Sequence, residues 1–524
     1  MTKNLAFNRR TSGILLHPTS LPGPHGNGDL GSSAYRFAEY LARAGQAWWQ
    51  MLPVGPTGAV NSPYQSYSAF AGNPLLISLD KLAQLGLLTP DDLRWDGPDT
   101  PSQVNFAAAA EFRKMRLRKA FTAFEKKRRS FEYERFIAFC QTNAWWLSDY
   151  ALFCMLKQAH GGVSWVDWAP ELRVRQAGAI DQALKKFGKE AYYYQFQQYQ
   201  FVRQWAELKD FCRGLGIGLI GDIPIFVAHD SADVWVNPGQ FYLQENGQPE
   251  VVAGVPPDYF SVTGQKWGNP LYRWPVMQER GFDWWIARFR ATFTYFDAVR
   301  LDHFIGFHRY WEIPGDAPTA ETGRWMAGPG ADFFTKIMHD LGPVAIIAED
   351  LGLITPEVKA LRDQFAFPGM RVLQFAFGTD ESADEFRPHN FPRNCVVYTG
   401  THDNDTTQGW FRARGRKASV PDQKEREMAL RYMGTKGQEF NWEMIRMAWM
   451  SVANTAIIPA QDLLGLGSEA RMNLPGRTEG EWGWRLQEGD LTPEIGRRLE
   501  LLTATYGRNL PATGAALQPA DLAP

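Results

Sequence analysis

The chain has 524 residues, of which 44% are hydrophobic and 21% charged, a balance that excludes a disordered chain. Its net charge is −2, and no basic block is long enough to indicate a nucleic-acid-binding face. No run of about 18 apolar residues could cross a bilayer. We therefore expect neither nucleic acid nor a membrane among its partners.

The start of the chain and its cysteines indicate the compartment. Residues 1–10 lack the apolar core of a signal peptide. Cys140, Cys154, Cys212 and Cys395 are scattered among apolar residues, without the spacing of a metal site. These features predict a cytoplasmic protein with reduced cysteines that needs no metal and no other cofactor.

Aromatic residues are frequent in this chain. They make up 14% of it, with 20 Trp, and many lie in loops rich in Gly, Pro and Asn rather than on periodic faces. Most of them must fill a large core. Exposed loop aromatics, however, suit stacking against the apolar faces of sugar rings, because Trp and Tyr offer a rigid amphipathic surface.

The first elements along the chain form a strand–helix–strand unit. Apolar residues predict a strand over residues 13–17, helical spacing predicts a helix over residues 33–44, and residues 48–52 supply a second strand. Residues 53–214 then interrupt the alternation, over a length far beyond an ordinary connection. We expect this insertion to be largely helical and to end in a helix over residues 192–213.

Six more short apolar segments predict strands, so the series contains eight. A second insertion at residues 229–290 carries a turn-rich loop at 250–270. Eight strands with helices between them predict an α/β fold, the (β/α)8 or TIM barrel, as one catalytic unit over residues 1–524 without a separate C-terminal β-sandwich. The Ala/Pro-rich segment 510–524 is expected to be a loosely held tail. The six segments are 217–222, 298–303, 345–349, 371–377, 396–402 and 456–462.

Polar side chains lie where four of these strands end. The C-terminal strand ends of a parallel barrel form the floor of the active site. One such end could hold only a structural ion pair, Arg300 with Asp302. Carboxylates delivered to the same end of the barrel by several strands predict an active site instead. The residues are Asp222, then Arg300, Asp302 and His303, then Glu349, then His402 and Asp403.

This set of residues suits cleavage of a glycosidic bond with retention, which needs two carboxyl groups about 5–5.5 Å apart. Arg300, two residues before Asp302 on a strand, points to the same side and would keep Asp302 ionised as the nucleophile. Glu349 would be the acid, with its proton favoured by the negative charge of Asp302 and Asp403. Asp403, helped by His402, suits binding of sugar hydroxyls and stabilisation of an oxocarbenium-like state.

The strand-end residues together resemble the four motifs of the α-amylase clan. The surrounding segments resemble one branch of it, the 4-α-glucanotransferases called amylomaltases or disproportionating enzymes, and the resemblance runs from residue 13 to about residue 485. Each matching segment is weak alone, but the set is specific because it occurs in order. The segments are HPTSLPG at 17–23, SPYQS at 62–66, GDIPI at 221–225, PPDYF at 256–260, GQKWGNP at 264–270, AEDLG at 348–352, YTGTHDND at 398–405 and NLPG at 473–476.

The resemblance implies an activity and residue roles. It implies transfer of a segment of an α-1,4-glucan to the 4-hydroxyl of glucose or of another α-1,4-glucan, by double displacement through a covalent glycosyl-aspartate. Asp302 would be the nucleophile, Glu349 the acid/base and Asp403 the transition-state stabiliser. The expected partners are α-1,4-glucans, maltooligosaccharides and glucose, and the expected state is a monomer or weak homo-oligomer. The implied substrate contacts are Arg300, His402, Asp222, Ser62, Tyr64, Asp258, Phe260, Gln265, Trp267, His303 and Asn473.

One departure from the hydrolytic amylases concerns metal. Those enzymes usually place Asn-His after the aspartate of the first motif, where the Asn is a calcium ligand and the His a sugar contact. This chain has Phe226 and Val227 there. We therefore expect no structural calcium.

Two other functions compete with glucan transfer. An α-amylase-type hydrolase would use the same trio of carboxylates, and only the attack of water on the glycosyl-enzyme would differ. The loop at 250–270, with Tyr259, Phe260 and Trp267, favours transfer because an aromatic lid can exclude water and bind an acceptor. A non-catalytic glucan-binding barrel would tolerate loss of Asp302 or Glu349, and both are present.

Overall fold

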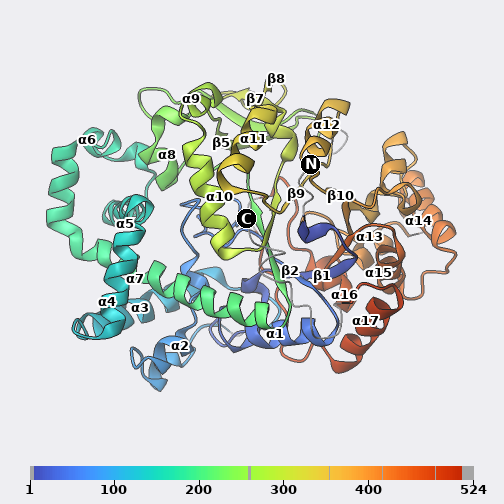
Figure 1. Cartoon of the computed structure of the whole chain (residues 1–524), viewed down its shortest axis with the longest axis horizontal. Helices are drawn as coiled ribbons and strands as arrows, with labels where there is room; N and C mark the ends of the chain where they lie inside the picture. Colours follow the sequence, from blue (N-terminus) through green and yellow to red (C-terminus); the bar gives the residue numbers. More distant parts are fainter. Residues whose placement is uncertain are drawn as a thin grey trace.

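The computed structural model describes residues 5–509 except 59, 99, 258–260, 353, 416 and 478–479. Eight parallel strands close into a barrel in the order β1-β12-β11-β10-β9-β6-β3-β2. The predicted (β/α)8 barrel is therefore confirmed (Figure 1). The strands are β1 (Thr11–Leu15), β2 (Trp48–Gln50), β3 (Gly218–Ile223), β6 (Ala298–Leu301), β9 (Ile346–Ala348), β10 (Gly369–Val372), β11 (Cys395–Tyr398) and β12 (Thr455–Pro459).

The barrel strands are short and buried along their whole length. Strands covered on both faces need continuous apolar runs, which is why the sequence marks them clearly. The parallel register places Asp222 of β3 beside Arg300 of β6. Three predicted strands are wrong in their ends. The strand predicted over 396–402 stops at Tyr398, and the one predicted over 456–462 stops at Pro459, where the helix Ala460–Leu464 follows. The strand predicted over 371–377 stops at Val372, because Leu373–Phe375 forms a 3-10 turn. The apolar run continues through that turn, so its pattern could not locate the end.

Helices cover the barrel and form a lobe on one side of it. Figure 1 shows the helices that follow β2 gathered on one side of the barrel and α13 to α17 on the other. The helices are α1 (Ser32–Arg43), α2 (Leu79–Gln84), α3 (Phe106–Glu125), α4 (Phe131–Thr142), α5 (Ala144–Ala159), α6 (Pro170–Arg173), α7 (Ala177–Gly214), α8 (Ala232–Val236), α9 (Trp274–Glu279), α10 (Asp283–Tyr295), α11 (Gly330–Leu341), α12 (Pro356–Gln364), α13 (Thr407–Ala413), α14 (Val420–Met433), α15 (Phe440–Met450), α16 (Ala460–Leu464) and α17 (Pro493–Thr505).

The segment between β2 and β3 contains α2 to α7. Its last helix, α7, begins at Ala177 rather than near residue 192. The early part of α7 contains Gly178 and Gly188, which lower helix propensity. Buried residues are concentrated in its second half, where Phe196 and Leu208 are fully covered. The apolar pattern of the sequence therefore predicted only the second half of α7, which packs against the rest of the protein.

A second sheet lies outside the barrel, and the sequence did not predict it. Antiparallel strands β4 (Val251–Val255), β5 (Gln265–Pro270), β7 (Arg309–Pro314) and β8 (Arg324–Ala327) pair in the order β5-β4-β7-β8. The predicted turn-rich loop at 250–270 is thus wrong in part, since most of it is the β4–β5 pair. Its Gly and Pro residues lower strand propensity, and β4 is stabilised by β7, which follows some 55 residues later.

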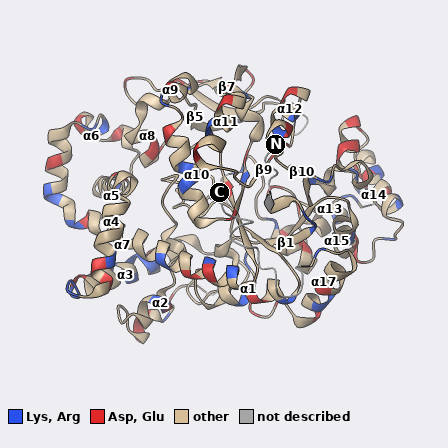
Figure 2. Ribbon diagram, in the orientation of Figure 1, with Lys and Arg blue, Asp and Glu red and all other residues tan. Residues whose placement is uncertain are grey.

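Other expectations concern the surface and the cysteines. Figure 2 shows Lys and Arg interspersed with Asp and Glu over the outer helices. None of the helices described is long and apolar enough to span a bilayer. All four cysteines lie in the described residues and are free. The predicted tail, residues 510–524, lies outside the described residues.

Candidate active site

An open pocket of about 600 Å³ lies at the C-terminal ends of β6, β9 and β11. Its wall also includes residues of β5 and of the loop that follows β2. The position agrees with the rule that barrel enzymes build their sites at this end. Eleven of the fourteen predicted site residues line it: Ser62, Tyr64, Gln265, Trp267, Arg300, Asp302, His303, Glu349, His402, Asp403 and Asn473.

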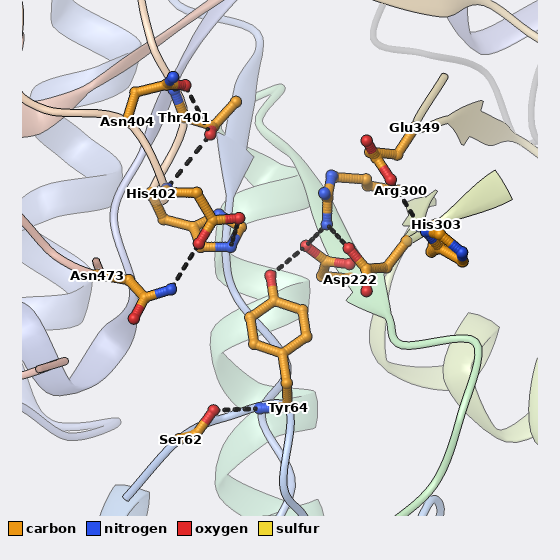
Figure 3. Close-up of polar contacts among 12 residues, drawn as sticks. Ser62, Tyr64, Asp222, Arg300, His303, Glu349, Thr401, His402, Asn404 and Asn473 are labelled. Carbon is orange, nitrogen blue, oxygen red and sulfur yellow. Dashed lines mark hydrogen bonds and ion pairs between the residues drawn. The ribbon is translucent and has the colours of Figure 1, made fainter. Parts of the chain in front are cut away.

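Arg300 is the central charge of the site. Its Nη1 lies 2.7 Å from Oδ2 of Asp222 and 2.8 Å from Oδ1 of Asp302. The hydroxyl of Tyr64 donates to the same Asp222 oxygen at 2.9 Å (Figure 3). Asp222 is buried beneath the pocket, whereas 27% of the Asp302 side chain remains exposed. Arg300 therefore supplies a fixed positive charge to Asp302, whose other oxygen is free to meet a ligand.

Glu349 follows β9 and is held by backbone donors. Its Oε2 accepts a hydrogen bond from the N–H of His303 at 2.7 Å. The backbone of His303 has a φ angle of 52°, in the left-handed region that a non-glycine residue seldom adopts. Burial raises the pKa of Glu349 to about 8, against the opposing effect of Arg300, and the negative charge of Asp302 raises it further. Glu349 is therefore protonated at neutral pH, but burial rather than neighbouring charge is the main cause.

Asp403 is oriented by its neighbours at the end of β11. Asn473 donates from Nδ2 to Oδ1 of Asp403 at 2.6 Å, and Nε2 of His402 lies 3.3 Å from Oδ2 (Figure 3). Arg471 donates to the Asp403 carbonyl oxygen at 2.6 Å. Burial lowers the pKa of His402, so its ring is neutral and can both donate and accept hydrogen bonds. The ring of Tyr64 stacks on the His402 ring, with their centroids 5.2 Å apart.

Aromatic groups close the other side of the pocket. The Trp267 ring meets His303 edge to face, with centroids 4.9 Å apart, and its Nε1 donates to Oε1 of Gln265 at 3.1 Å. Ser62 accepts a hydrogen bond from the Tyr64 N–H. The predicted contacts Asp258 and Phe260, and Tyr259 between them, lie outside the described residues.

Several pocket residues were not predicted. Trp482 lies 5.8 Å from Tyr64 and 5.9 Å from His402 by ring centroids, and its φ of 68 is unusual for a bulky residue. The sequence signal for Trp482 was weak, since it follows the NLPG segment without a motif of its own. Other lining residues outside the prediction include Gln65, Lys266, Asn269, Trp325, Phe375, Thr401, Asn404 and Arg477.

No part of the described chain groups three or more His, Cys, Asp or Glu side chains in an arrangement that could hold a metal ion. Phe226, at the position where the amylases carry a calcium ligand, lines the pocket. The centroid of its ring lies 6.5 Å from that of the His303 ring. An apolar ring cannot supply the oxygen ligands that calcium requires. The residues at this position therefore do not fit that ion.

Comparison with known proteins identifies relatives over nearly the whole chain. A family model described as 4-alpha-glucanotransferase matches residues 16–492. A 4-alpha-glucanotransferase of Thermus thermophilus is 50% identical over 508 residues, covering 95% of this chain and 99% of that protein. A 4-alpha-glucanotransferase of Synechocystis sp. is 48% identical over 508 residues, covering 96% of this chain and 99% of that protein. The solved structure of an amylomaltase from Streptococcus agalactiae in complex with acarbose superposes with a TM-score of 0.92 at 37% identity, covering 96% of this chain and 100% of that one. The chain belongs to the 4-alpha-glucanotransferase family.

Proposed function

We propose that this 4-α-glucanotransferase moves a segment of an α-1,4-glucan to the 4-hydroxyl of glucose or of another α-1,4-glucan, by a retaining double displacement. The observation that carries the mechanism is the placement of two unlike carboxyl groups in one pocket. Asp302 is paired with Arg300, and Glu349 has a pKa raised to about 8. Two carboxyl groups with different environments are what nucleophile and acid require.

In the first step a carboxylate oxygen of Asp302 bonds to the anomeric carbon of the donor. The bond from that carbon to the glycosidic oxygen breaks, and Glu349 gives its proton to the leaving 4-oxygen. The part of the glucan beyond the cleavage point leaves with a free 4-hydroxyl, and the donor segment stays on Asp302 as an ester.

In the second step an acceptor 4-hydroxyl attacks the same carbon. Esterified Asp302 no longer carries its charge, so the repulsion that helps raise the pKa of Glu349 is lost, and Glu349 ionises more readily. The ionised Glu349 takes the proton from the acceptor hydroxyl as the new glycosidic bond forms and the ester bond breaks. Two inversions give net retention.

Asp403 and His402 contribute in the transition states. Asp403 carries a carboxylate that Asn473 and His402 hold in place, and its side chain is 42% exposed to the pocket. A negative charge fixed near the sugar ring stabilises positive charge that develops there. Neutral His402 suits a sugar hydroxyl, because its ring has one donor and one acceptor.

Trp267 is proposed to favour the sugar acceptor over water. It packs on His303, whose N–H binds Glu349, so its ring lies near the acid/base. Replacing Trp267 by Ala should raise the ratio of hydrolysis to transfer, because water outnumbers any acceptor and only placement favours the sugar. First-step cleavage should stay within about tenfold, or about 1.4 kcal/mol. The ratio is measured from glucose and reducing ends released from maltotriose.

Val262→Ala provides the control for that experiment, since Val262 lies between β4 and β5 and is 84% exposed. It should leave the ratio unchanged. If both rates of Trp267→Ala fall together at a constant ratio, Trp267 only supports the fold and acceptor choice lies elsewhere.

Metal independence is a separate prediction. Prolonged treatment with a strong calcium chelator should leave transfer from maltotriose unchanged, because Phe226 and Val227 occupy the calcium-associated position. The rate is compared before and after dialysis against the chelator. A loss of activity that added calcium restores would contradict the prediction.

The products from maltotriose test the function itself. A transferase converts maltotriose into a ladder of longer oligosaccharides plus glucose, whereas an α-amylase-type hydrolase yields only glucose and maltose. We expect the ladder. We further propose that the protein acts in the cytoplasm, which its four free cysteines support, and that it is a monomer or weak homo-oligomer.

A further inference from the structure

A second hollow lies away from the proposed active site, between α5, α8 and α10. Two adjoining cavities of about 230 and 390 Å³ share Phe70, Trp145, Trp146 and Ala287. Neither has a lining residue in common with the active-site pocket. The larger of them falls in the size range of small-molecule sites. We call this hollow the aromatic pocket.

Trp145, near the start of α5, lies at the mouth of the aromatic pocket and is 54% exposed. Its ring is nearly perpendicular to Phe70, with centroids 5.0 Å apart. Phe70 in turn contacts Trp146 and Trp284, both almost fully buried. The exposed Trp145 ring therefore packs against a cluster of buried aromatic rings, which holds it in place. A fixed, solvent-facing Trp offers the flat apolar surface on which the C–H face of a sugar stacks.

Gln240 lines the smaller of the two cavities and is only 2% exposed. Neither its Nε2 nor its Oε1 has a hydrogen-bond partner among the described residues. Buried amides are normally paired, so an unpaired one that faces a cavity needs a reason. Its donor and acceptor lie side by side, and two neighbouring sugar hydroxyls could satisfy both.

Three carboxylates and two arginines line the aromatic pocket: Asp149, Asp233, Arg280, Asp283 and Arg290. Arg280 pairs with Asp283, and Asp149 pairs with Arg175. Arg290 lines the other cavity, is exposed, and forms no ion pair with the described residues. The buried charge is Asp233, whose Oδ2 accepts from the Ala69 N–H at 2.8 Å and which forms no ion pair with the described residues. Carboxylate oxygens accept hydrogen bonds from hydroxyl groups, so the hollow suits an uncharged, hydroxyl-rich ligand.

The chain links the two sites directly. Tyr64 of the proposed active site and Phe70 of the aromatic pocket belong to the same loop, six residues apart. A small cavity of about 70 Å³ is lined by both of them. The two sites therefore border one common cavity.

We propose that the aromatic pocket is a secondary, non-catalytic site for a segment of α-1,4-glucan, with Trp145 as its stacking platform and Gln240 as its polar contact. The proposal rests on the proposed function, because it takes the substrate of that reaction as its ligand. A polymer bound at two places gains from effective concentration, so the pocket would favour long donors over short ones.

Binding tests the proposal directly. Titration of maltoheptaose into Asp302→Asn, which cannot turn it over, should show two binding events. Adding Trp145→Ala should leave one event unchanged and weaken the other by about tenfold, the effect expected from loss of one stacked ring. Gln240→Met should also weaken it without lowering the melting temperature, because it removes an unpaired buried amide at similar volume. Phe131→Ala, at a 74% exposed ring on α4, is the control and should change nothing.

Kinetics separate this proposal from the proposed function. With Asp302 intact, Trp145→Ala should transfer from maltotriose at the parent rate but raise KM for amylose about tenfold. Failure of the parent to transfer from maltotriose would overturn the proposed function instead. A single binding event in the Asp302→Asn parent, equal losses on maltotriose and amylose, or a change only in the sedimentation mass of Trp145→Ala would overturn the secondary site. The last result would assign Trp145 to contact between two copies of the chain.

Discussion

Replacing Asp302 by Asn should lower transfer from maltotriose by several orders of magnitude while the fold remains intact. The substitution keeps the shape of the side chain but removes the charge that attacks the anomeric carbon. The fold should survive because Arg300 keeps its ion pair with Asp222 at 2.7 Å, and an amide oxygen can still accept from Arg300. The rate of glucose release, together with the melting temperature, measures both effects.

Asp316→Asn is the matched control for this experiment. Asp316 is exposed and lies outside the pocket, so its loss of charge should leave the rate unchanged. Near-normal transfer by a folded Asp302→Asn variant would show that another group forms the bond to the sugar.

Replacing Glu349 by Gln should nearly abolish transfer from maltooligosaccharides but spare the first step on an α-glucosyl fluoride. Fluoride is a good leaving group and needs no proton, whereas a sugar oxygen does. The variant should also lose a feature of the pH profile. Burial raises the pKa of Glu349 to about 8, so the acid form is present at neutral pH and is lost as the pH rises through 8.

The parent enzyme should therefore show a fall in kcat/KM for maltotriose above about pH 8, and Glu349→Gln should show no such limb with the fluoride. Initial rates across the pH range, with both donors, provide the measurement. Equal losses on the two donors, or an alkaline limb that persists in Glu349→Gln, would remove Glu349 from the acid/base role.

Much of the barrel could be predicted from the sequence, for a physical reason. A strand buried on both faces needs a continuous apolar run, and a polar residue directly after the run is conspicuous. Asp302, Glu349 and Asp403 were found in this way, and the structure places all three in one pocket. Their roles in catalysis stay predictions.

The parts that were missed depend on contacts between distant segments. Strand β4 carries weak local signals and is stabilised by pairing with β7. Trp482 reaches the pocket because its loop folds back against Tyr64 and His402, which no local pattern reveals. The cause of the raised pKa of Glu349 was misjudged for a similar reason. Neighbouring charge can be read from strand ends, but burial depends on how the whole pocket closes.

The covalent intermediate tests the account most directly. Glu349→Gln, supplied with an α-glucosyl fluoride and little acceptor, should accumulate a glycosyl-enzyme because the second step lacks its base. Intact mass should rise by one glucosyl residue, and peptide mapping should place the addition on Asp302. An adduct on any other residue, or rapid turnover of the fluoride with no adduct and inverted product, would contradict the proposed double displacement through Asp302.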